Sequence, residues 1–128
     1  MTAMRIRAVG LAFSVVLAPA ALADALDKAV YMNTYYCAGI AEVYGERLGS
    51  SRRSEAGEAA QAAVELRSRA QSFGRRLGYS DAEGRSAEAQ GRQTMARMLP
   101  QNGAWMSGGP IPQDAFRQYK HCASLAGL

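Results

Sequence analysis

Apolar residues recur along this chain every three or four positions, which is the spacing of one face of a helix. The first helical segment is predicted from about Ala25 to Leu48, with Gly49 as its stop. Its apolar stripe is Leu26, Val30, Cys37, Ile40, Tyr44 and Leu48. The second segment follows and ends at Leu77, before Gly78. Its inner face is Ala56, Ala59, Ala63, Leu66, Ala70, Phe73 and Leu77.

The third and fourth segments are bounded by clear turn chemistry. Ser80 opens a capping box, and Pro100 ends the helix that begins there. The weaker inner stripe of this third segment is Ala82, Ala89, Ala96 and Leu99, with Met95 and Met98 alongside. Residues 101–111 form a loop, after which Pro112 suits the first turn of the fourth helix. The inner face of that helix is Phe116, Tyr119, Cys122, Ala123 and Ala126.

These segments predict an all-α fold, because no stretch of the chain alternates like a strand. Short connections place successive helices antiparallel, so we expect a small antiparallel four-helix bundle stapled by one disulfide. Several glycines fall inside the helical segments, and each costs roughly 1 kcal/mol relative to alanine. They are Gly39, Gly45, Gly57, Gly74, Gly84 and Gly91. Close helix approach would offset this cost, but the simpler expectation is a glycine-tolerant bundle of marginal stability.

The N-terminus has the pattern of a cleavable signal peptide. Arg5 and Arg7 precede an apolar run, Ala8–Leu17, that is too short to span a bilayer. The small-x-small pattern of residues 21–23 is what a signal peptidase requires. We therefore expect a signal peptide over residues 1–23 and a bacterial periplasmic or secreted protein.

Cleavage would leave residues 24–128 as a single helical domain that starts at Asp24. The whole chain has 15 Lys and Arg against 11 Asp and Glu, and the signal peptide removes two arginines. The mature charge is therefore +2, from 13 basic and 11 acidic residues, which gives no reason to expect nucleic-acid binding. No second apolar run reaches transmembrane length, so we expect no stable membrane anchor after cleavage.

The two cysteines are predicted to form a disulfide, because the expected compartment is oxidising. Cys37 lies twelve residues before Gly49, and Cys122 lies ten residues after Pro112. In an antiparallel bundle these helix ends lie together, so the two cysteines come to nearly the same height. A redox-active pair would instead favour a CxxC arrangement. The spacing thus favours a structural bond.

His121 is the only histidine, and no nucleophile or orienting acid accompanies it in a recognisable motif. No His, Cys, Asp or Glu cluster has metal-ligand spacing, so we expect no metal and no cofactor. A four-helix bundle of this size superficially resembles the b-type cytochrome bundles, and the candidates for ligating haem in their manner are Met32 and His121. If the cysteines are level, Met32 lies about 7.5 Å further along the axis and roughly 140° around the helix from Cys37, which argues against haem.

Aromatic residues are the remaining signal. Tyr31 and Tyr35 lie on a face different from that of Cys37, and Trp105 lies in the long loop. Exposed Tyr and Trp beside arginine are typical of partner surfaces. The candidate partner-binding residues are Trp105, Met106, Arg52, Arg53, Tyr31 and Tyr35. In the alternative, Trp105 covers the open end of the bundle as part of the core.

The arginines of the second and third segments alternate with glutamates at helical spacing, which predicts a solvated face. They are Arg67, Arg69, Arg75, Arg76, Arg85, Arg92 and Arg97. An enzyme would have to use scattered carboxylates such as Glu42, Glu46 and Asp114, whose pairing no motif specifies. The sequence therefore predicts a non-enzymatic binding or accessory module of the cell envelope with an unidentified protein partner. A haem-type cofactor carrier and a small periplasmic chaperone are the alternatives.

Overall fold

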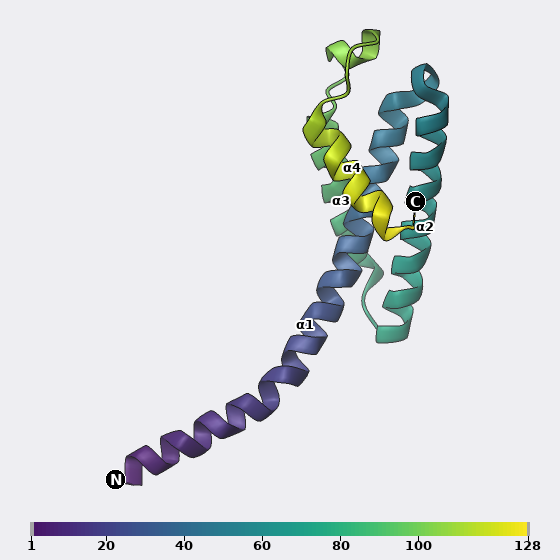
Figure 1. Cartoon of the computed structure of the whole chain (residues 1–128). Coiled ribbons are helices and arrows are strands. Elements are labelled where there is room, and N and C mark those ends of the chain that lie inside the picture. Colours follow the sequence, from purple (N-terminus) through teal and green to yellow (C-terminus); the bar gives the residue numbers. More distant parts are fainter. Residues whose placement is uncertain (1, 128) are drawn as a thin grey trace. The chain divides into compact units, whose positions relative to one another are not determined.

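A computed structural model describes the backbone of residues 2–127 and the side chains of residues 21–127 (Figure 1). All secondary structure in this part of the chain is helical. The elements are α1 (Thr2–Leu48), η1 (Gly49–Arg52), α2 (Arg53–Leu77), α3 (Asp81–Met98), η2 (Ala104–Ser107) and α4 (Gln113–Leu125). The predicted all-α class is confirmed. The chain divides into two compact units, Met1–Val30 and Tyr31–Leu128, which are described separately.

The first unit is the N-terminal part of α1, and most of the predicted signal peptide lies outside the residues whose side chains are described. Leu26 and Val30 were predicted to belong to the inner stripe, but they are 58% and 55% exposed. The buried face of α1 begins instead at Tyr31. Among the described residues, no helix combines the length and apolar character needed to cross a membrane.

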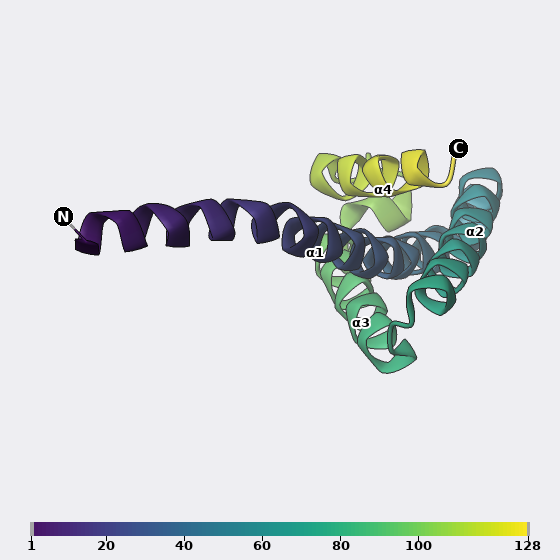
Figure 2. The same cartoon turned by 90° about the horizontal axis from the view of Figure 1, so that it is seen from below.

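In the second unit, the C-terminal half of α1 lies between the other three helices (Figure 2). From Cys37 to Gly45 every residue except Glu42 is buried. A helix that is covered on all sides has no single apolar stripe. The spacing of apolar residues therefore did not predict that Ala38, Ala41 and Val43 are inside, although they are as buried as the residues of the predicted stripe.

Glycines bring the backbones of α1 and α3 into direct contact. A Cβ added at Gly39 would lie 2.1 Å from the carbonyl oxygen of Glu88, and one added at Gly91 would lie 2.0 Å from that of Tyr36. No larger residue fits at either position without a backbone shift. The expectation of merely tolerated glycines is therefore wrong here, because the missing side chains set the distance between the two helices.

A second pair of glycines makes room for two tyrosine rings of α1. A Cβ at Gly74 of α2 would lie 2.6 Å from the ring of Tyr31, and one at Gly84 of α3 would lie 2.3 Å from the ring of Tyr35. Only Gly57 among the six helical glycines fits the original expectation, since nothing lies within 4 Å of its added Cβ.

The predicted helix ends agree closely with the structure, except that the first helix was expected to begin at about Ala25 and α1 begins at Thr2. Gly78 ends α2 in the left-handed conformation with a φ of 76°, and its N–H donates to the carbonyl of Gly74. Ser80 caps α3, accepting a hydrogen bond from the Ala82 N–H at 3.2 Å. The predicted faces are less accurate. Residues expected inside but exposed in the structure are Leu77, Ala82, Ala89 and Phe116. The buried face of α3 is Gly84, Ala87, Gly91 and Met95.

Candidate functional site

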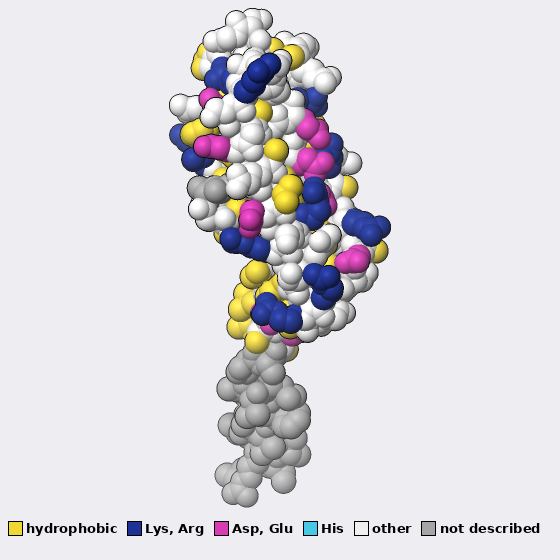
Figure 3. All heavy atoms as spheres, turned by 90° about the vertical axis from the view of Figure 1, so that its right-hand side faces the viewer, with side chains coloured by type: hydrophobic (Ala, Val, Ile, Leu, Met, Phe, Trp, Pro, Cys, Tyr) yellow, Lys and Arg dark blue, Asp and Glu magenta, His cyan; other side chains and the backbone are white. Residues whose placement is uncertain are grey.

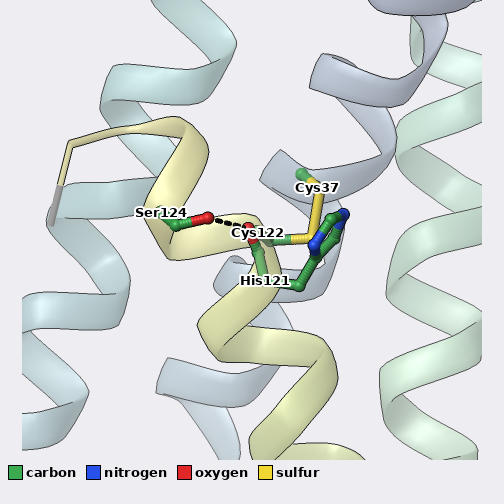
Figure 4. Close-up of a disulfide and its surroundings, with 4 residues drawn as sticks. All are labelled: Cys37, His121, Cys122 and Ser124. Carbon is green, nitrogen blue, oxygen red and sulfur yellow. Dashed lines mark hydrogen bonds between the residues drawn. A yellow bond between two sulfur atoms is a disulfide. The ribbon is translucent and has the colours of Figure 1, made fainter.

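Cys37 of α1 and Cys122 of α4 form the predicted disulfide, with their Cα atoms 5.0 Å apart (Figure 4). The pairing inferred from their matched heights is confirmed. The exposed fractions of the two residues are 1% and 0%, so an attacking thiolate has no access to either sulfur. The bond joins residues separated by 85 positions. In this setting it is a structural link between the first and last helices.

The remaining candidate ligands lie in different surroundings. His121 is exposed beside the disulfide on α4, and its carbonyl accepts a hydrogen bond from the Ser124 hydroxyl at 2.7 Å (Figure 4). Met32 instead packs against the buried cluster that contains Tyr31 and Tyr35. Within the described residues, no group of three or more His, Cys, Asp and Glu side chains is placed to hold a metal ion.

Trp105 lies in the protein core. This is the second of the two placements that the sequence allowed, the first being an exposed contact residue. Its side chain is 3% exposed and packs within the main core cluster, and its Nε1 donates to the carbonyl of Pro100 at 3.1 Å. Arg52 ties the same loop to the start of α2, because its Nη2 donates to the carbonyl of Gly109 at 2.8 Å. Both residues therefore hold the loop in place, and the expectation that Trp105 covers the end of the bundle as part of the core is confirmed.

A surface hollow of about 300 Å³ nevertheless lies where the loop meets the α1–α2 turn. We call it the loop-end hollow, and it is lined by Arg47, Leu48, Gly49, Ser50, Ser51, Trp105 and Met106. Met106 is 48% exposed. The Nε atom of Arg47 is buried and has no hydrogen-bond partner among the described residues. Trp105 and Met106, selected from sequence, thus border one hollow, whereas Arg47 was missed because only the fold brings it there.

Tyr31 and Tyr35 were predicted as exposed candidates, and the structure corrects this. They are 1% and 2% exposed, and their rings meet edge to face with centroids 5.3 Å apart. The Tyr31 hydroxyl donates to the carbonyl of Ser80 at 2.9 Å. Burial raises the pKa of both phenols. The sequence signal that would have found this core is Gly74 and Gly84, whose missing side chains leave the space for these rings.

Two of the predicted surface arginines join three helices instead. Arg67 of α2 pairs with Glu42 of α1 and with Glu88 of α3, the latter at 2.6 Å. Arg92 of α3 pairs with Glu42 and, at 3.2 Å, with Glu46. Burial raises the pKa of Glu42, against the opposing effect of the two guanidinium groups. Three carboxylates thus share two arginines in a partly buried interhelical network.

Asp114, the third carboxylate considered for an enzyme, lies in the first turn of α4. Its Oδ1 accepts a hydrogen bond from the backbone N–H of Ala115 at 2.9 Å. A carboxylate here also interacts favourably with the positive end of the helix. Glu42, Glu46 and Asp114 therefore each make a structural contact. Asp114 is not part of the network in which Arg92 joins Glu42 and Glu46.

Comparisons of this chain with models of known protein families, with curated proteins and with solved structures give no match.

Proposed function

We propose that this protein is an exported, non-enzymatic binding module of the bacterial cell envelope, and that the loop-end hollow is its contact site. The observation that carries the proposal is Arg47, a charged residue that lines the hollow while its buried Nε lacks a hydrogen-bond partner in the described structure. An unmade bond of this kind costs about 1–3 kcal/mol. A partner whose acceptor draws this guanidinium outward, so that Nε is no longer buried without a bond, recovers part of that cost.

The chemistry of the hollow favours an acidic side chain next to an apolar one as the occupant. Carboxylates are the strongest acceptors for a guanidinium, and two-point pairing fixes their orientation. Arg53 is also exposed nearby, at the start of α2. The half-exposed thioether of Met106 offers an adaptable apolar contact on the other side of the hollow. A protein segment with this pair of side chains therefore complements the site.

Site-specific photo-crosslinking in the native host tests the proposal. A photoreactive amino acid at Met106 should cross-link one dominant envelope protein, whereas the same label at the exposed residue Gln61 of α2 should not. The identified protein is then purified and titrated against the mature chain. We expect Arg47→Met and Met106→Ser each to weaken binding at least tenfold. Met106→Ser should leave the melting temperature nearly unchanged, and Arg47→Met should not lower it, because the substitution removes the unbonded buried Nε. Equal labelling at both positions, or unchanged affinity in both variants, would refute the site.

Two further parts of the proposal concern the mature form. We propose that export removes residues 1–23, which intact-mass measurement of the exported protein tests directly; a chain that does not begin at Asp24 contradicts it. We also propose that the mature chain is an antiparallel four-helix bundle. The antiparallel course of α1 and α2 in Figure 1 and the bond between α1 and α4 support this architecture. A crystal structure of the mature protein is its test.

A further inference from the structure

A second hollow, on the outer side of α2, has a chemistry unlike that of the loop-end hollow. It has a volume of about 760 Å³. We call it the arginine hollow, and it is lined by Ser68, Arg69, Ser72, Phe73, Arg75 and Arg76. Figure 3 views the molecule from the side on which α2 lies, with basic side chains in dark blue and hydrophobic ones in yellow. The lining contains three arginines, two hydroxyls and an aromatic ring, but no carboxylate.

Two of the three guanidinium groups are held in place by the fold. Arg69 reaches across to α4, where Nη1 donates to the carbonyl of Leu125 at 2.6 Å and Nη2 to that of Ala126 at 3.2 Å. The guanidinium of Arg76 lies over the ring of Phe73, 5.4 Å from its centroid. Preorganised guanidinium groups beside hydroxyls are suited to the oxygen atoms of a phosphate ester.

The positive charge of the hollow is only partly neutralised. Arg69 has one carboxylate neighbour, Glu65, at 3.8 Å on the same exposed helix surface. Arg75 and Arg76 are exposed and make no ion pair with any residue that the structure describes. Such a surface attracts anions at short range, since charges in solution are screened within about 10 Å at moderate salt.

Exposed leucines lie next to this charge. Leu77 directly follows Arg76 and is 42% exposed, and Leu125, whose carbonyl binds Arg69, is 41% exposed. They end α2 and α4 respectively. Arginines with adjacent exposed leucines are what a protein presents to the boundary between lipid headgroups and acyl chains. A soluble phosphate compound would use the arginines but has no need of the leucines.

From this arrangement we propose that the arginine hollow binds the phosphate headgroup of an anionic lipid, with Leu77 and Leu125 entering the outer edge of the acyl region. The contact is peripheral and reversible, since two leucines and two unpaired arginines give far less binding energy than a membrane-spanning helix. The protein is thereby held at a lipid surface while the loop-end hollow, which is formed by different residues, stays available.

Vesicle flotation with the mature, oxidised protein tests this proposal. We expect binding to phosphatidylcholine vesicles that contain phosphatidylglycerol, little binding to phosphatidylcholine alone, and loss of binding at high salt. The double substitution Arg75→Gln/Arg76→Gln should weaken binding roughly thirtyfold. The matched control is Arg97→Gln/Arg117→Gln, which removes the same charge from exposed positions elsewhere and should bind nearly as well as the unmodified protein.

Further arms of the experiment separate the lipid from other sources of the same chemistry. Leu77→Ser/Leu125→Ser should also weaken vesicle binding although it keeps every charge, and soluble glycerol phosphate should compete poorly. Equal losses in the two arginine pairs would show general charge attraction and overturn the proposal. An unaffected leucine variant together with strong competition by glycerol phosphate would make this a site for a soluble phosphate. Melting temperatures close to that of the unmodified protein establish that all these variants are folded.

Discussion

Glycine-to-alanine substitution at Gly91 and at Gly57 should change stability in opposite directions. Both residues are inside helices, so both substitutions gain about 1 kcal/mol of helix propensity. At Gly57 nothing lies within 4 Å of the new Cβ, and this gain is the whole effect. Gly57→Ala should therefore stabilise the protein by about 0.5–1 kcal/mol.

At Gly91 the new Cβ would lie 2.0 Å from the carbonyl oxygen of Tyr36, where ordinary contacts begin at 3.4 Å. The difference of 1.4 Å has to come from separating α1 and α3, because the obstructing atom belongs to a helix backbone. Overpacking of this kind costs about 1–3 kcal/mol. Where the separated helices leave a gap approaching 1 Å, each dispersion contact loses up to about half of its energy. Because the obstructing atom is in the backbone, we expect a cost in the upper part of this range. Subtracting the gain of about 1 kcal/mol in helix propensity leaves a net loss of about 1–2 kcal/mol for Gly91→Ala.

Thermal and urea unfolding of the mature, oxidised protein, followed by circular dichroism, measures both effects. For a domain of this size each 1 kcal/mol shifts the melting temperature by roughly 4–8 °C. Gly91→Ala should therefore melt well below the unmodified protein, and Gly57→Ala slightly above it. Gly39→Ala provides a second test from the other side of the same contact, since its Cβ meets the carbonyl of Glu88 at 2.1 Å. If Gly91→Ala and Gly39→Ala were as stable as Gly57→Ala, the close approach of α1 and α3 would be refuted.

Three further predictions concern the core. Trp105→Ala should destabilise the protein by about 3–5 kcal/mol in urea unfolding, as loss of a buried aromatic does; a loss below about 1 kcal/mol would contradict its place in the core. Replacing Cys37 and Cys122 together by alanine should cost about 2–5 kcal/mol in the same assay, and unchanged stability would contradict the bond's structural role. Burial raises the pKa of Tyr44 to about 12 from 10.0. The stability that its protonated phenol contributes is complete below pH 10.0 and falls as pH approaches about 12. Ultraviolet titration of Tyr44→Phe and of the unmodified protein checks this, because the difference between the two curves is the titration of Tyr44. A Tyr44 phenol that titrates near 10.0 in this difference would contradict the prediction.

The helix ends were predictable because they depend on local chemistry. Gly78 adopts a conformation that other residues avoid, and Ser80 bonds to a backbone group two residues away. The disulfide was predictable because, in antiparallel helices, the matched heights follow from counting residues between each cysteine and its helix end. The inner face of α3 was not, since its buried residues Gly84 and Gly91 carry no hydrophobic signal. Their importance appears only when the facing helix supplies a ring or a carbonyl group.

The candidate sites show the same division between local and tertiary information. The loop sequence identified Trp105 and Met106, but Arg47 joins them only through the turn that follows α1. The pairing of Arg67 and Arg92 with acids on α1 requires three helices in register, and helical spacing alone predicted solvated side chains. Leu125 reaches the arginine hollow because the end of α4 lies against α2, a contact between segments 56 residues apart.

The bond between Cys37 and Cys122 also fixes an order of events during biogenesis. In the proposed export route Cys37 crosses the membrane first, and its partner follows 85 residues later. At roughly 5–20 residues per second, the pace of synthesis, this delay is about 4–17 s. Through that interval the thiol of Cys37 meets oxidants without its correct partner. The last helix must arrive before the first is secured. Since the chain has two cysteines, any earlier disulfide of Cys37 joins it to another molecule, and attack by the Cys122 thiolate on that bond forms the native pair.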